Sequence, residues 1–124
     1  MADPTQVRNA GDPQQVRRAG RADKRRAARR LAAYRAVLAT PEGRFVLADL
    51  LARAGIYASG FAPDALRMAF LAGRREFGLE LQATLIGADD RAYDVMEREA
   101  RARAHADAQE AEAAHTPPAE ERET

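Results

Sequence analysis

The residue types that most often carry enzyme chemistry are scarce and widely separated in this chain of 124 residues. The chain has no cysteine, and Ser59 is its only serine. The two histidines, His105 and His115, lie far along the chain from Ser59, without the close spacing of zinc ligands. A Ser–His nucleophilic pair is therefore not expected. Glu76 and Glu80 share a helix face, as solvated glutamates commonly do. We predict a protein that is not an enzyme and that holds no metal or cofactor.

Arginine chemistry, by contrast, is concentrated in residues 17–30, which carry eight basic side chains and one acid, Asp23. Guanidinium groups suit bidentate contacts with phosphates, and such binding depends steeply on salt. The segment has no aromatic side chain for base stacking, no amide for base readout and no bulky apolar side chain for a membrane surface. Two interpretations remain open, namely nonspecific contact with a polyanion and an arm that is either solvated or docked on a protein. The predicted contact residues are Arg17, Arg18, Arg21, Lys24, Arg25, Arg26, Arg29 and Arg30.

The net charge of +1 conceals an uneven distribution of charge along the chain. Residues 1–35 hold ten basic and three acidic side chains, a balance of +7. Residues 36–100 hold seven basic against ten acidic side chains, and residues 101–124 hold three against six, so each of these segments carries −3. Such polarity indicates terminal segments with different partners, or segments that only keep the protein in solution.

The first residues form a tandem near-repeat, in which residues 3–11 are followed by the similar residues 12–20. Each copy begins with Asp-Pro and ends with Gly, the signals that start and stop a short helix. The repeat is interpreted as a flexible, partly helical arm or as a short docking motif presented twice. The predicted organisation is a flexible arm at 1–20, a helical core domain at 21–100, and a polar helix extension with a disordered tail at 101–124.

Apolar residues recur at helical spacing in four segments, and no segment alternates as a strand does. The first predicted helix covers residues 21–40, and its basic front half should fray because like charges four residues apart repel. Further helices are predicted at residues 41–54, at residues 64–86, and from residue 89 or 90 toward residue 115. The predicted fold class is all-α, a small bundle of about four helices.

The core of this bundle must come from roughly 65 residues, near the lower limit for independent folding, so we expect either marginal stability as a monomer or help from a partner. Gly73 and Gly78 interrupt the third helix, which indicates either close helix–helix packing or a bend. The apolar side chains expected to face the core are Leu31, Tyr34, Val37, Leu38, Phe45, Leu47, Leu50, Leu51, Leu66, Phe70, Phe77, Leu81, Leu85, Tyr93 and Met96.

The middle of the chain also carries a recognisable set of short motifs. They are Tyr34-Arg35-Ala36-Val37-Leu38, Thr40-Pro41-Glu42-Gly43-Arg44, Ala72-Gly73-Arg74-Arg75-Glu76-Phe77-Gly78 and Tyr93-Asp94-Val95-Met96-Glu97-Arg98-Glu99. With these motifs, residues 34–99 resemble a small domain family of tailed bacteriophages, named after a virion-gene product of a Bordetella podovirus. Neither the repeat nor the arginine-rich segment belongs to the resemblance, and it carries over no catalytic or binding residue.

The resemblance implies a phage structural or assembly protein, a minor virion component at the portal, the tail or the ejection apparatus that acts by protein–protein contacts. The alternative is a nonspecific nucleic-acid-associated protein that uses the arginine-rich segment. The expected partners are other virion proteins, packaged DNA and further copies of the chain. The longest uncharged run has ten residues, so no membrane span is expected. With no apolar leader at the N-terminus, we expect the protein in the virion or the cytoplasm of the bacterial host.

Overall fold

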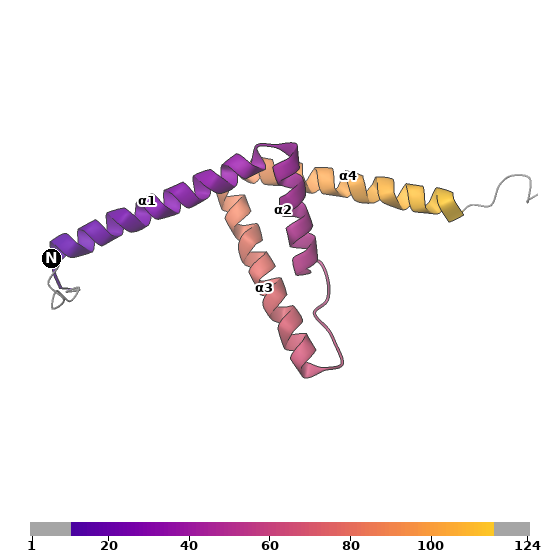
Figure 1. Ribbon diagram of the computed structural model, residues 1–124, viewed down its shortest axis with the longest axis horizontal. Coiled ribbons are helices and arrows are strands. Elements are labelled where there is room, and N and C mark those ends of the chain that lie inside the picture. Colours follow the sequence, from indigo (N-terminus) through magenta and orange to yellow (C-terminus); the bar gives the residue numbers. More distant parts are fainter. Residues whose placement is uncertain (1–10, 116–124) are drawn as a thin grey trace, which may run out of the picture.

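The structure, a computed structural model, describes residues 11–115. This part of the chain contains four helices, α1 (Pro13–Leu38), α2 (Pro41–Ala54), α3 (Ala65–Ala88) and α4 (Asp90–His115), and no strand. The predicted all-α class with four helices is therefore confirmed. Figure 1 shows α1 and α4 extending in opposite directions from a common junction, while α2 and α3 leave that junction side by side as an antiparallel hairpin.

The helices begin at the capping signals in the sequence. The side chain of Thr40 accepts a hydrogen bond from Gly43 N at 3.0 Å, with Pro41 in the first turn of α2. Asp12 accepts from Gln14 N at 2.9 Å, so α1 begins at Pro13 and not at residue 21 as predicted. The second copy of the repeat thus forms the start of α1. The first copy, apart from Gly11, and the tail predicted to be disordered lie outside the described residues.

The core lies at the junction, where each helix contacts the other three. Leu38, Leu51, Leu85 and Met96 are at most 2% exposed and come from all four helices in turn. Around them pack Leu47, Ile56, Ala88 and Tyr93, with Leu31, Tyr34 and Leu81 half-buried at the edge. The connection between α2 and α3 also buries Ala62.

Six of the side chains expected in the core are exposed instead, namely Val37, Phe45, Leu50, Leu66, Phe70 and Phe77. For Leu66 and Phe70 the reason is length, because α3 has 24 residues whereas α2 has 14. The N-terminal half of α3 extends past the end of α2, as Figure 1 shows, and no other helix covers it. The prediction that the whole apolar stripe of α3 faces inward is therefore wrong for this half of the helix.

Candidate interaction surfaces

Residues 13–30 of α1, here called the basic arm, form a single helix that projects from the junction (Figure 1). All eight predicted contact residues lie on it and are exposed. Arg17, Arg21, Arg25 and Arg29 follow one another at intervals of four and form one continuous stripe. Within the described residues, the one ion pair on the basic arm joins Arg26 to Asp23. The arm therefore presents a high density of positive charge to its surroundings.

Residues 104–115 of α4, here called the acidic arm, project from the opposite side of the junction. Every residue of the acidic arm is exposed. Asp107, Glu110 and Glu112 give it a charge of −3 with both histidines neutral. In the part of the chain that the structure describes, no group of three or more acidic or histidine side chains is arranged to hold a metal ion.

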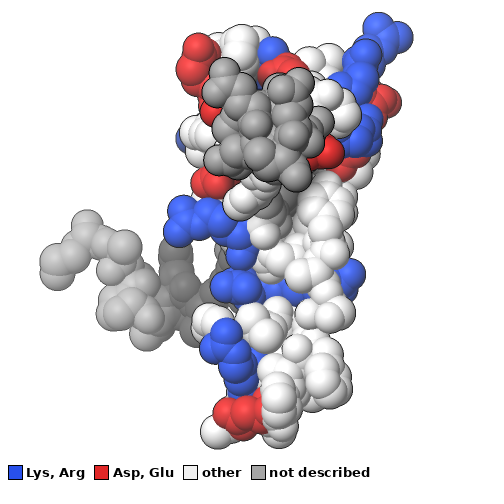
Figure 2. All heavy atoms as spheres, turned by 90° about the vertical axis from the view of Figure 1, so that its right-hand side faces the viewer, with Lys and Arg blue, Asp and Glu red and all other residues white. Residues whose placement is uncertain are grey.

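The hairpin carries the largest exposed apolar side chains. We call five of them the hairpin face, namely Tyr57, Phe61, Leu66, Phe70 and Phe77, whose exposed fractions range from 64% to 82%. Three of the five lie on α3 at spacings of four and seven, so they project from the same side of that helix. Figure 2 shows uncharged surface running down the hairpin below α4, with basic side chains beside it.

Gly73 and Gly78 of α3 lie in different surroundings. A Cβ atom added to Gly78 would lie 2.6 Å from Ala54 Cβ and 2.6 Å from Ile56 Cγ2, so α3 and the end of α2 approach closely there. A Cβ atom added to Gly73 would meet nothing within 4 Å. Gly73 lies between Phe70 and Phe77 on the exposed stripe, where it leaves a notch among large side chains.

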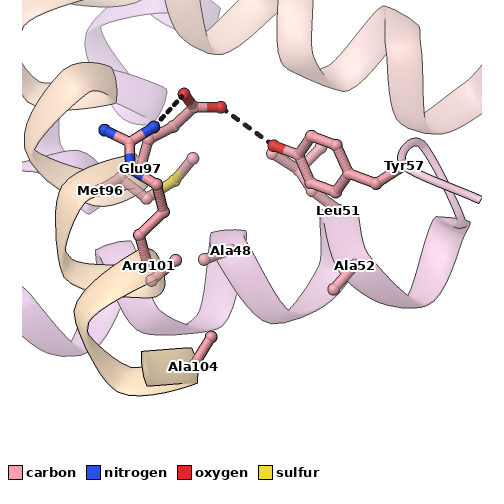
Figure 3. Close-up of a pocket in the computed structure, with 9 residues that line it drawn as sticks. Ala48, Leu51, Ala52, Tyr57, Met96, Glu97, Arg101 and Ala104 are labelled. Carbon is pink, nitrogen blue, oxygen red and sulfur yellow. Dashed lines mark hydrogen bonds and ion pairs between the residues drawn. The ribbon is translucent and has the colours of Figure 1, made fainter. Parts of the chain in front are cut away.

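A groove of about 350 Å³ separates α2 from α4. Its walls are formed by small side chains of both helices, and Leu51 and Met96 lie at its base (Figure 3). Tyr57, Glu97 and Arg101 supply the polar groups. The small side chains are Ala48, Ala52, Ala100 and Ala104. Sequence reasoning missed this groove, because alanine spacing alone does not show which helices meet.

Glu97 is the acceptor at the polar end of the groove. Its Oε1 accepts one hydrogen bond from the Tyr57 hydroxyl at 3.0 Å and another from the Tyr93 hydroxyl at 2.7 Å. Gln82 Nε2 donates to the Tyr93 hydroxyl at 2.7 Å. Loss of solvent raises the pKa of both tyrosines above the ordinary value of 10.0, and the nearby Glu97 carboxylate raises it further. Both phenols therefore stay protonated and donate to Glu97 at neutral pH.

Comparison with known proteins gives one family. The family model described as Bbp19-like phage protein matches residues 34–98, about half of the chain. No curated protein and no solved structure matches the chain. Among the described residues, no helix is both long enough and apolar enough to cross a membrane. The matched residues contain the core, the hairpin face and the N-terminal part of the groove's α4 wall, whereas both arms lie outside the match.

Proposed function

Since the chain belongs to the Bbp19-like phage proteins, we propose that it is a structural or assembly protein of a tailed phage. It acts by contacts with other virion proteins as a minor component of the portal, the tail or the ejection apparatus. The observation that carries this proposal is the hairpin face, whose large apolar side chains are left exposed by the rest of the described chain.

Leu66, Phe70 and Phe77 would supply most of the binding energy of such a contact. Burying one such side chain stabilises a complex by about 1.5–3 kcal/mol before the costs of association. Soluble monomers seldom expose large contiguous apolar patches, and those that they do expose often bind partners. Because Gly73 has no side chain, the hairpin face is hollowed between Phe70 and Phe77. A partner side chain can therefore enter between the two phenylalanines. The proposed role needs no catalytic group, and we propose that the protein is not an enzyme.

Mass spectrometry of purified particles tests the proposed role. The wild-type chain is expected in mature particles, and the variant Phe70→Ser/Phe77→Ser is expected to be lost from them. Because both phenylalanines are exposed, the variant should still fold, which circular dichroism of the purified protein checks. The matched control is Arg67→Ser/Glu80→Ser, which changes two exposed residues of the same helix.

Two outcomes would contradict parts of the proposal. Reproducible absence of the wild-type chain from mature particles removes the virion-component role, and its presence in precursor particles alone would identify an assembly factor. Normal incorporation of the Phe70→Ser/Phe77→Ser variant would show that the hairpin face is not the docking surface.

The second candidate is a nonspecific nucleic-acid-associated protein, and the exposed basic arm favours it. A single helix with eight basic residues can neutralise several phosphates, with affinity that falls steeply as salt increases. A gel shift with random duplex DNA at low and moderate salt tests this function, using the full chain and a deletion of residues 1–30. No shift at low salt, or a shift that the deletion leaves unchanged, would exclude it.

A further inference from the structure

The two arms of the protein are oppositely charged helices whose side chains are almost all exposed in the described part of the chain. In the basic arm only Ala19 and Ala22 are partly buried, and in the acidic arm no residue is. An isolated helix of this length is marginal in water, and the stripe from Arg17 to Arg29 adds repulsion at every interval of four. The basic arm would therefore be stabilised by an anionic partner along its length.

The protein itself carries a surface of this kind. Residues 13–30 have a charge of +7, from eight basic residues and Asp23, and residues 104–115 have a charge of −3. At 1.5 Å per residue these arms are ~27 Å and ~18 Å long, so the acidic arm can lie along most of the basic one. Within one chain the arms cannot meet, because they point away from each other (Figure 1).

We infer that two copies of the chain form a closed dimer, in which the basic arm of each copy lies antiparallel to the acidic arm of the other. Both arms run in the same direction through one molecule, from the N-terminal tip of α1 to the C-terminal end of α4. A two-fold axis perpendicular to that direction places each basic arm beside the partner's acidic arm, so the same contact forms twice. The antiparallel orientation also brings the positive end of one helix dipole to the negative end of the other.

The surface of the acidic arm suits such a neighbour. Ala104, Ala108 and Ala111 lie on one side of α4 and continue the alanine wall of the groove in Figure 3. By the helical repeat of 100° per residue, Asp107 lies beside this stripe, about 60° from Ala104, and Glu110 lies about 120° from Ala104 on the same flank. Small side chains let a second helix approach closely, and Asp107 is then the carboxylate nearest its arginine stripe, with Glu110 adding negative charge on the same flank. The charge complementarity favours a second copy over DNA, because the acidic arm would have no role on a duplex.

Sedimentation velocity of the purified full chain, freed of nucleic acid, tests the dimer. We expect a dimer at about 0.1 M salt that dissociates toward about 1 M, as the Debye length falls from ~10 Å to ~3 Å. The variant Asp107→Lys/Glu110→Lys should weaken the dimer by roughly a hundredfold, since two reversed charges act twice in a symmetric contact. Arg21→Glu/Arg25→Glu should do the same, and combining the two variants should restore the dimer.

The control Glu76→Lys/Glu80→Lys makes the same change of charge on α3, and it should leave the dimer intact. A monomer at about 0.1 M salt would overturn the inference. So would a dimer that is weakened by the control substitutions but not by the substitutions in the arms. Assemblies that grow beyond the dimer with concentration would replace the closed pair with head-to-tail contacts. Binding of duplex DNA by a chain that stays monomeric would assign the basic arm to nucleic acid instead. These readouts need no phage particle, so they fail or succeed independently of the proposed virion role.

Discussion

Arg44 Nε lies 2.7 Å from Glu99 Oε1 and joins the start of α2 to α4. The same guanidinium donates through its NH1 nitrogen to the carbonyl oxygen of Leu38 at the end of α1, at 3.0 Å. Its side chain is 16% exposed and that of Glu99 is 30% exposed, so water only partly screens the pair. One arginine thus holds three helices together beside the core.

Replacing this arginine should destabilise the fold. We expect Arg44→Leu to lower the free energy of unfolding by about 1.5–3 kcal/mol, because charge-assisted hydrogen bonds contribute about that much. The control is Arg53→Leu, which removes an exposed pair with Asp49 at 3.9 Å and should change stability by less than about 1 kcal/mol. Urea unfolding followed by circular dichroism measures both. Equal losses in the two variants would show that the contacts of Arg44 contribute no more than those of a surface pair.

Gly43 is required by the tight connection between α1 and α2. A Cβ atom there would lie 1.9 Å from the carbonyl oxygen of Val37 and 2.9 Å from the Thr40 hydroxyl oxygen. Gly43→Ala should therefore destabilise the protein by about 1–3 kcal/mol or more, although alanine is the better helix former. Gly87→Ala is the control, because its Cβ atom meets nothing within 4 Å. A melting temperature that falls as much for Gly87→Ala as for Gly43→Ala would contradict this account.

The helices could be predicted because their signals are local. Thr40-Pro41 and Gly55 bound α2 as expected, and Gly55 adopts a φ of 78° that favours glycine. The start of α1 was predicted too late, since Asp12-Pro13 was assigned to a separate arm although it caps the same helix. Helix spacing also identified Tyr93 and Met96 correctly as core residues.

Whether an apolar residue is covered depends on the lengths of the helices and on where they cross. Neither can be read from the spacing of apolar residues in the sequence. Leu81 and Phe77 lie on the same side of α3, yet Leu81 packs on the core whereas Phe77 is 67% exposed. The groove between α2 and α4 and the contacts of Arg44 depend likewise on residues far apart in the sequence. The basic stripe, in contrast, could be located from sequence alone, because its residues lie on one helix and its formation does not depend on how the helices pack.

Alkaline pH should weaken the protein through Tyr93. Burial and the neighbouring Glu97 raise the pKa of its phenol in the folded state, so the folded protein keeps a proton that the unfolded chain releases near pH 10. The stabilisation is complete below about pH 10 and is lost as the pH rises above that value. The free energy of unfolding, measured by urea titration between about pH 8 and about pH 11, should therefore decline at the upper end.

The variant Tyr93→Phe tests whether the Tyr93 phenol causes this loss of stability at alkaline pH. At neutral pH this variant should be less stable by roughly 1 kcal/mol, since it loses the bond to Glu97 and leaves Gln82 without its acceptor. Above pH 10 its stability should decline less steeply than that of the wild type. Tyr57→Phe should change the slope less, because Tyr57 is 72% exposed. An unchanged slope in Tyr93→Phe would exclude Tyr93 as the source of the alkaline loss.

Gly73 and Gly78 of α3 should respond in opposite directions to the same substitution. Gly78→Ala should lower the free energy of unfolding by about 1–3 kcal/mol, because the added methyl group meets Ala54 and Ile56 at 2.6 Å. Gly73→Ala should raise it by up to about 1 kcal/mol, since the methyl group enters open space in a helix. If a partner side chain enters the notch at Gly73, the stabilised Gly73→Ala variant should nevertheless be incorporated less into particles. Thermal unfolding and particle mass spectrometry together test this, and a Gly73→Ala variant incorporated like the wild type would show that no partner uses the notch.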